Sequence, residues 1–407
     1  MVGSGVIAEQ EPPLWRNRDY VLLWTGNLIS SIGSAMVLIA LPLLVLAITG
    51  KALQTGTVAA AEAIPFIALS LPIGAVVDKY PRRGLLILAG GVAMLATALI
   101  PVTYYLHHLA IGIIYVVAVL VGCATALDQI AQVAVLPRLV GESRLAAASG
   151  QAELIYNVSA IAGPPLAGLL LSKGHLAVPF IVDSASFGVL VLAVGMIRSG
   201  LDSENTAETG RWREEIFIGF RKLAQHRNLR ALSIMTLTGD FLFAGITVLM
   251  TVLLKFRGAS AQTIGEAFAI AAAGGVIGSL SAARFERAIP LVPSVILRSW
   301  ATALLFPLLA TGIPPIALGF VWGLMNIMIA FMNVTQRRLT ISLVPGDALG
   351  RTQAIVTFAS FAVLPIGAVF TGVMLEFAGG RGTVLTFAGV LALVAIYSSV
   401  SRDLRTP

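Results

Sequence analysis

The most constraining feature of this sequence is a series of apolar runs, each long enough to cross a lipid bilayer as a helix. A spanning helix needs about 20 apolar residues, because the hydrocarbon core is about 30 Å thick. The chain is 57% hydrophobic and 12% charged, whereas soluble domains carry about 25% charged residues. Its surface is therefore predicted to face mostly lipid. The runs lie at 22–48, 55–77, 84–104, 109–136, 146–171, 176–197, 230–254, 262–283, 291–311, 313–335, 350–375 and 382–400.

The widest polar stretch of the chain lies midway, between the sixth and seventh apolar runs. This arrangement predicts an all-α membrane protein with twelve transmembrane helices in two pseudo-symmetric six-helix halves. The domain bounds expected from the sequence are an N-terminal cytoplasmic segment at 1–21, a first half at 22–197, a central loop at 198–229, a second half at 230–400 and a tail at 401–407.

The central loop ends in a segment with helical amphipathic spacing. Trp212, Ile216, Phe220 and Leu223 recur at helical intervals, with charged residues between them. Such a segment can lie on the inner membrane face with its apolar side in the lipid. A linker helix packed on the inner loops fits the same spacing equally well.

The positive charges predict the orientation of the helices. Cytoplasmic loops of membrane proteins carry an excess of lysine and arginine. If the N-terminus is cytoplasmic and the loops alternate, 22 of the 27 basic residues fall on the inner side. We therefore expect a multi-pass protein of the cell membrane with both termini in the cytoplasm, and the sequence pI of about 9.8 needs no nucleic-acid partner. The outer side keeps Lys51, Lys173, Lys255, Arg257 and Arg381.

The two halves share residues at a constant separation of 204 positions. The matched pairs fall in equivalent loops and helices of each half, and a common register favours internal duplication over chance. Many transporters are built from such repeats, with the substrate site at the interface between them. The pairs are Gly74 with Gly278, Arg83 with Arg287, Gly163 with Gly367 and Gly168 with Gly372.

Polar residues recur at helical spacing on the first and fourth helix of each half. A polar side chain is costly in hydrocarbon unless it faces protein or water. The stripes predict either a shared aqueous cavity or hydrogen bonds that only hold the bundle together. They comprise Asn27, Ser30, Ser31 and Ser34; Thr125, Asp128, Gln129 and Gln132; Thr236, Asp240, Thr247 and Thr251; and Asn326, Asn333 and Arg337.

Acidic residues inside the spans are candidates for carrying protons. A carboxyl in hydrocarbon can bind and release a proton, or it can pair with a cation such as Arg298 or Arg337. Asp240 lies about ten residues into its run, which is near the bilayer centre at 1.5 Å per residue, and it leads the candidates together with Asp128. Glu62 and Glu266 are expected near outer helix ends, where water reaches them. Further candidates are Glu153 and Asp183.

The loop after the second run resembles a signature of the major facilitator superfamily. The segment from Gly74 to Arg83 follows the superfamily pattern Gly-x-x-x-Asp-(Arg/Lys)-x-x-Arg-(Arg/Lys), with Asp78, Lys79 and Arg82 at the charged positions. The resemblance implies a cluster that latches the two halves on the cytoplasmic side. The second half has Ala282 at the position of the aspartate.

A second group of motifs resembles the drug- and siderophore-exporting branch, whose members are proton antiporters. Gly163, Pro164 and Gly168 follow the antiporter pattern Gly-Pro-x-x-(Gly/Ala)-Gly, while Ser159 replaces a glycine that usually precedes it. The opening from 14 to 24 and the segment from 180 to 187 are similar to the same branch. The fourth helix carries Gln129 and Gln132 where many antiporters have an arginine.

Together these features predict a proton-coupled exporter of small amphipathic molecules that works as a monomer by alternating access. An importer that brings in a small metabolite by proton symport is the alternative. An enzyme is not expected, because no His/Cys/Asp metal cluster and no Walker-type phosphate loop is present in the sequence. The predicted partners are a small-molecule substrate, protons and the lipid bilayer, without a metal or a cofactor.

Overall fold

A computed structural model describes residues 13–198, 227–343 and 346–401 of the chain. These residues are almost entirely helical and contain no strand. The amphipathic segment at 211–223, the first residues and the C-terminal tail lie outside the described residues. The long helices are α1 (Arg18–Thr49), α2 (Ala52–Lys79), α3 (Arg82–Tyr105), α4 (Ile111–Val140), α5 (Leu145–Ser172), α6 (Val178–Gly195), α8 (Arg227–Phe256), α9 (Ala261–Ala288), α10 (Leu291–Leu305), α11 (Pro315–Leu343) and α12 (Gly346–Val400).

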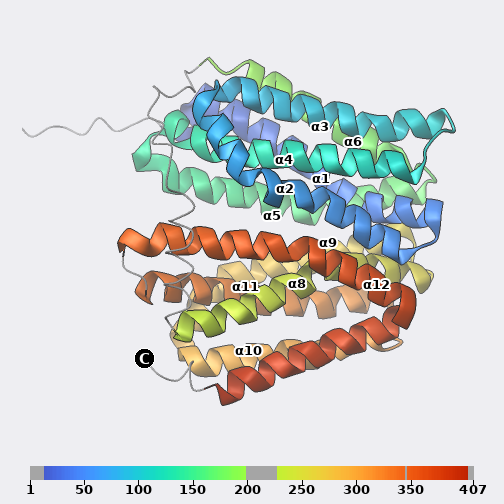
Figure 1. Cartoon of the computed structure of the whole chain (residues 1–407), viewed down its shortest axis with the longest axis vertical. Coiled ribbons are helices and arrows are strands. Elements are labelled where there is room, and N and C mark those ends of the chain that lie inside the picture. The colour runs from blue at the N-terminus through green and yellow to red at the C-terminus, as the bar shows by residue number, and fades with distance from the viewer. Residues whose placement is uncertain (1–12, 199–226, 344–345, 402–407) are drawn as a thin grey trace, which may run out of the picture.

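The predicted transmembrane architecture is confirmed. Eleven segments of the described chain are long and apolar enough to cross a membrane, and the last of them is 43 residues long. It contains Gly379, whose φ of 67° and ψ of 177° break the helical path, so α12 consists of two helices joined across a kink. Figure 1 shows α12 doubling back at this point. With α12 counted as two helices, the fold has the twelve expected segments.

Several helices begin earlier than the apolar runs predict. Helix α1 starts at Arg18 because the Asn17 side chain accepts hydrogen bonds from the backbone N–H groups of Asp19 and Tyr20. Such a cap satisfies donors that would otherwise lack partners at a helix N-terminus. Helix α8 likewise starts at Arg227, before the predicted bound of the second half. Hydropathy detects the part of a helix that lies in hydrocarbon and misses polar helix ends.

The helices form two bundles that lie against each other. In Figure 1, α1 to α6 occupy the upper half and α8 to α12 the lower half, with all helices roughly along one direction. Contact between the bundles runs mainly through two helix pairs, α2 with α12 and α5 with α9. The loops at 80–81 and 141–144 mark the predicted cytoplasmic end of this interface, and the loops at 50–51 and 173–177 mark the predicted outer end.

Glycines related by the 204-residue separation make equivalent contacts inside each half. A Cβ added at Gly163 of α5 would lie 3.1 Å from the carbonyl oxygen of Ile32 in α1. A Cβ at Gly367 of α12 would lie 2.1 Å from the carbonyl oxygen of Phe241 in α8. Both glycines therefore let the fifth helix of a half press against the first helix of the same half. This correspondence supports the internal duplication.

The second pair of related glycines makes equivalent contacts between the halves. A Cβ at Gly168 of α5 would lie 2.6 Å from the carbonyl oxygen of Ala261, at the start of α9. A Cβ at Gly372 of α12 would lie 3.1 Å from the Cα atom of Leu53, at the start of α2. Both contacts lie at the predicted outer end, where the two bundles are closely packed.

Candidate functional site

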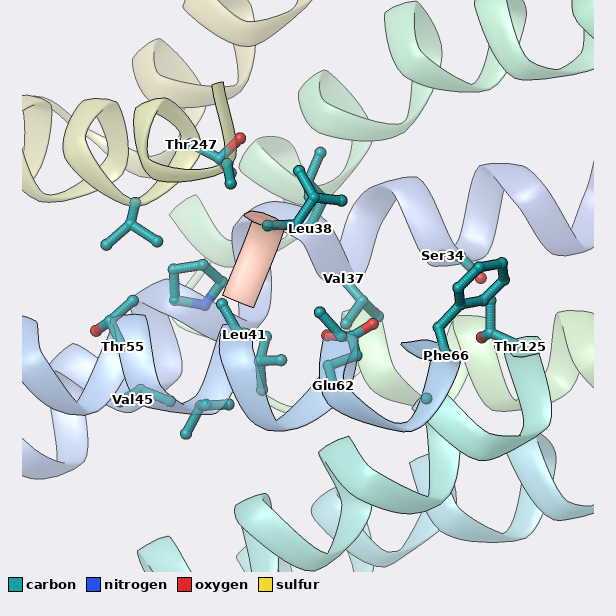
Figure 2. Close-up of a pocket in the computed structure, with 18 of the residues that line it drawn as sticks. Ser34, Val37, Leu38, Leu41, Val45, Thr55, Glu62, Phe66, Thr125 and Thr247 are labelled. Atoms are coloured by element: carbon teal, nitrogen blue, oxygen red, sulfur yellow. The ribbon is translucent and has the colours of Figure 1, made fainter. Parts of the chain in front are cut away.

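A pocket of about 350 Å³ lies between the two halves, and we call it the central pocket. Helices α1, α2 and α4 line it from the first half, and α8 and α12 line it from the second. Most of the lining is apolar. The polar groups are few, as in small-molecule sites that use them to orient a ligand: they are Ser34, Thr55, Glu62, Thr125, Gln129 and Thr247, most of which are labelled in Figure 2.

Two aromatic rings close one side of the central pocket. Phe66 of α2 and Phe361 of α12 both line it, and their ring centroids are 4.2 Å apart with an interplanar angle of 34°. Because α2 and α12 belong to different halves, this ring contact joins the halves. Aromatic pairs of this kind are worth about 0.5–1.5 kcal/mol beyond their area burial.

A larger cavity of about 700 Å³ adjoins the interface between α5, α9 and α11, and we call it the inner cavity. Its lining reaches Ser149 near the start of α5 and Asn333 near the end of α11, which lie toward the predicted cytoplasmic end. Leu38 and Thr247 line both the inner cavity and the central pocket. The two spaces therefore adjoin each other along α1 and α8.

Eight residues predicted from the polar stripes and acids line these two spaces. Ser34, Glu62, Thr125 and Gln129 lie in the central pocket, Glu153, Asn326 and Asn333 lie in the inner cavity, and Thr247 lines both. The Asn326 side chain also donates to the backbone oxygen of Ala271 at 2.8 Å, which ties α11 to α9. The stripe on α11 therefore serves the cavity and the packing of the bundle at once.

Three other predicted residues bind one another and line neither space. The side-chain amides of Asn27 in α1 and Gln132 in α4 exchange two hydrogen bonds of 3.0 Å. The Gln132 Nε2 also donates to Asp128 Oδ2 at 2.6 Å. This network holds α1 against α4, which is the interhelical bonding that the sequence left as the alternative to a cavity.

Asp240 also lies away from both spaces. The side chain of Ser360 in α12 is its hydrogen-bond neighbour. Its Oδ2 atom is buried and has no hydrogen-bond partner among the described residues. A buried acceptor without a partner is costly, so Asp240 sits in an unusual environment even though it lines neither the central pocket nor the inner cavity.

Asp183 is buried behind α1. Asp183 is 3% exposed, and Ser34 Oγ donates to its Oδ1 atom at 3.2 Å. A Cβ added at Gly33 would lie 2.8 Å from the same Oδ1 atom. The missing side chain at Gly33 therefore lets the carboxylate of α6 approach α1.

Glu62, which lines the central pocket, lies deeper along its helix than the apolar run predicts. It was expected near an outer helix end, but α2 begins at Ala52 and places Glu62 about 15 Å along the helix. That is about half the thickness of the hydrocarbon core. Among the residues that the structure describes, Glu62 is the one ionisable residue that lines the central pocket (Figure 2). The helix start, rather than the start of the apolar run, would have located it.

The charged motif after α2 ties helices together within the first half. Arg82 donates to the backbone oxygen of Ala134 in α4 at 3.1 Å, and Arg83 donates to the backbone oxygen of Gly195 at the end of α6. Lys79 lies over the Tyr80 ring, 5.5 Å from its centroid. Asp78 is exposed and forms no ion pair within the described residues.

The glycine at the start of this motif has open space beside it. No atom lies within 4 Å of a Cβ added at Gly74. Its partner in the repeat differs, because a Cβ at Gly278 would lie 2.8 Å from the Cα atom of Ile327 in α11. The two halves are therefore not equivalent at this position.

The antiporter-like motif lies in the interface between the halves. A Cβ added at Gly265 of α9 would lie 2.4 Å from the carbonyl oxygen of Pro164. With the contact between Gly168 and Ala261, this brings the backbones of α5 and α9 together. Pro164 also lines the inner cavity, so the motif separates that cavity from the predicted outer end.

Comparison with known proteins identifies the family. Residues 23–340 match the sequence profile of the Major Facilitator Superfamily. The chain belongs to this superfamily. The predicted resemblance is thereby confirmed, and the members to which the chain is similar are membrane transporters.

Similar sequences carry names of efflux proteins and of a siderophore transporter. The chain is 26% identical over 400 residues to the multidrug efflux pump Tap of Mycobacterium tuberculosis, covering 94% of both chains. It is 21% identical to macrolide efflux protein A of Streptococcus pyogenes, covering 96% of this chain and 97% of that one. It is 27% identical over 263 residues to the staphyloferrin A transporter of Staphylococcus aureus, covering 64% of each.

Solved structures confirm the fold. The nucleoside transporter NupG superposes with a TM-score of 0.76 at 14% identity, covering 96% of this chain and all of that one. A bacterial homologue of the human lysosomal transporter Spinster, in an inward-facing and unoccupied conformation, superposes with a TM-score of 0.74 at 15% identity. That match covers 96% of this chain and 98% of the homologue.

The described residues contain no group of three or more His, Cys, Asp or Glu side chains that could hold a metal ion. The polar side chains that line the two spaces carry carboxylates, hydroxyls and amides, as at Glu62, Ser34 and Asn333. Such groups can bind a small molecule and can bind or release protons.

Proposed function

We propose that this protein exports small amphipathic molecules across the cell membrane in exchange for protons, by alternating access. The observation that carries the proposal is the central pocket, which is largely apolar, is shared by both halves and contains the carboxylic acid Glu62. A site between two repeats can open to either side when the halves rock against each other. The efflux names of the similar sequences support the outward direction.

The alternating movement would use different contacts at each end of the interface. The close glycine contacts of α5 with α9 and of α12 with α2 hold the predicted outer end together. At the other end, the exposed Asp78 is available to bind a partner in the second half once that end closes. In this proposal the segment Gly74–Arg83 is the conformational latch, with Arg82 and Arg83 fixing its position on α4 and α6.

The membrane arrangement proposed here follows the distribution of positive charge. Both termini and the central loop lie in the cytoplasm, and the inner cavity then opens toward the side from which an exporter takes its substrate. A single chain contains both halves and both spaces, so a monomer suffices. Protons supply the energy, and no cofactor is required.

The test measures accumulation of the fluorescent amphipathic dye ethidium in cells that express the protein. We expect less dye in expressing cells than in cells with an empty vector, and a protonophore should abolish the difference. Inside-out vesicles should take up the dye only when a pH gradient, acidic inside the vesicle, is imposed. If expression instead raises cellular accumulation and the protonophore abolishes the rise, the protein is a proton-symport importer.

A further inference from the structure

Two carboxylic acids, one in α2 and one in α6, lie beside α1. Glu62 of α2 faces the central pocket, and Asp183 of α6 is buried behind α1. The two lie close enough for the charge of Glu62 to act on Asp183. Neither acid forms an ion pair within the described residues.

Ser34 of α1 is bonded to one of these acids and lines the same pocket as the other. Its side chain lines the central pocket together with Glu62, and its hydroxyl donates to Asp183 Oδ1 at 3.2 Å. The Ser186 hydroxyl donates to the backbone oxygen of Asp183 at 2.7 Å, and Ser186 does not line the central pocket. Within the described residues, Ser34 is therefore the side chain that links Asp183 to the pocket.

The surroundings of the two acids are poor in positive charge. The helices that pack on α2 and α6 are α1, α3, α4, α5, α8 and α12. Basic residues of α2 and these helices stand near helix ends: Arg18, Lys79, Arg82, Arg83, Arg138, Arg227, Arg230, Lys255, Arg351 and, just past the kink of α12, Arg381. The other titratable groups along their central parts are Tyr115, Cys123, Asp128, Glu153, Tyr156 and Asp240.

Without a cation between them, two neighbouring carboxylates in an apolar region cannot both carry charge at low cost. At least one of two such acids is then favoured to hold a proton, because like charges repel and burial disfavours ionisation. The geometry adds a route for that proton. A proton that reaches the Ser34 oxygen from the central pocket can displace the hydroxyl proton toward Asp183, so one proton moves and the serine is unchanged.

We infer that Glu62, Ser34 and Asp183 form the proton-binding site of this transporter. Glu62 exchanges its proton for substrate in the central pocket, and Asp183 holds the proton through Ser34 while substrate occupies the pocket. The inference rests on the proposed proton-coupled transport and names the residues that perform the coupling. It assigns the coupling to Glu62 and Asp183 rather than to Asp128 or Asp240.

The first experiment reads the protonation of Glu62 without any substrate. Dicyclohexylcarbodiimide modifies protonated carboxyls in apolar sites, and mass spectrometry of the purified protein locates the modified residue. We expect Glu62 to be modified, with a yield that falls as pH rises. In Asp183→Asn the fall should shift to lower pH, because the neighbouring negative charge that favours a protonated Glu62 is gone. Absence of modification at every pH, or an unchanged profile in Asp183→Asn, would overturn the inference.

The second experiment separates coupling from substrate binding in proteoliposomes. We expect Glu62→Gln to lose uptake of ethidium driven by a pH gradient and to keep exchange of ethidium at equal pH. Ser34→Ala should slow only the gradient-driven uptake. The matched control is Glu376→Gln, an exposed acid of α12 that lines neither space and should behave as the wild type.

The two experiments distinguish failure of the inference from failure of the proposed function. If the wild type takes up ethidium under the gradient and Glu62→Gln does so equally well, the inference is wrong and the proposed function stands. If the wild type moves no ethidium while Glu62 shows the expected modification profile, the proton site stands and the proposed export fails. Loss of gradient-driven uptake in Asp128→Asn or Asp240→Asn with full uptake in Glu62→Gln would place the proton site elsewhere.

Discussion

The two ends of the interface between the halves are built from opposite kinds of residue. At the predicted outer end, glycines bring backbone against backbone, as where a Cβ at Gly56 of α2 would lie 2.4 Å from the carbonyl oxygen of Ala368 in α12. At the predicted cytoplasmic end, polar and charged side chains such as Ser149, Glu153 and Asn333 line an open cavity. Tight packing therefore specifies one end, whereas the other end depends on polar groups and on charge.

The first prediction concerns which end is the cytoplasm. Cytoplasmic reporter enzymes fused after residue 203 and at the C-terminus should both be active, because the positive-inside bias places both positions inside. The effect is all or none. If a reporter that functions only outside the cell is active at either position, the predicted orientation is wrong. The inner cavity would then lie on the extracellular side.

The second prediction tests the glycine-packed end. Gly56→Ala should abolish most transport and lower thermal stability, because the new methyl group collides with the backbone of α12. Overpacking of this kind costs about 1–3 kcal/mol. Dye efflux and the midpoint of thermal unfolding of the purified protein measure the two effects.

The matched control for this prediction is Gly91→Ala in α3. No atom lies within 4 Å of a Cβ at Gly91, so the change should leave transport intact and add helix stability of up to about 1 kcal/mol. Equal behaviour of the two variants would show that the outer end does not depend on close backbone contact.

The third prediction tests the charged end. Asp78→Asn should impair transport without lowering thermal stability, because Asp78 is exposed and has no ion-pair partner within the described residues. Loss of one charge should shift the equilibrium between two conformations by a few kcal/mol at most. Accessibility of a single cysteine introduced at Ser149 should rise if the open state gains population. Wild-type efflux in a well-expressed variant would exclude the latch.

The fourth prediction concerns an acid that faces neither end. Asp128→Asn should retain pH-driven efflux and cost about 1 kcal/mol of stability or less, because an amide oxygen can still accept from Gln132. Transport assays in proteoliposomes and thermal unfolding measure these effects. Uncoupled transport in this variant would show that the polar network of α1 and α4 takes part in proton movement.

The fold could be predicted from the sequence, because each span leaves a long apolar run and the repeat leaves residues in a common register. The glycines at 163, 168, 367 and 372 show why the register is informative, since each pair makes equivalent backbone contacts. Helix ends were predicted less well, because polar caps such as Asn17 extend helices beyond the hydrocarbon.

The candidate site could be predicted only in part, because a polar stripe does not tell which partner each side chain meets. Asn27, Asp128 and Gln132 bind one another, whereas Gln129, one position further around α4, lines the central pocket. The placement of Glu62 and Asp183 on either side of α1 depends on α6, which is distant in sequence from α1 and α2. The absence of a side chain at Gly33 lets Asp183 approach α1, and the hydropathy pattern does not predict such a contact.

The ring contact between Phe66 and Phe361 has a consequence for the speed of the transporter. Any rocking motion that moves α2 past α12 must first part these rings, which lie 4.2 Å apart. The contact between the rings is lost before the transition state of this motion. It forms again only after the halves have reached their new arrangement. An energy of about 1 kcal/mol in such a contact changes a rate by roughly fivefold. In the proposed rocking motion, this pair would therefore lower the turnover number, separately from how tightly the pocket binds its substrate.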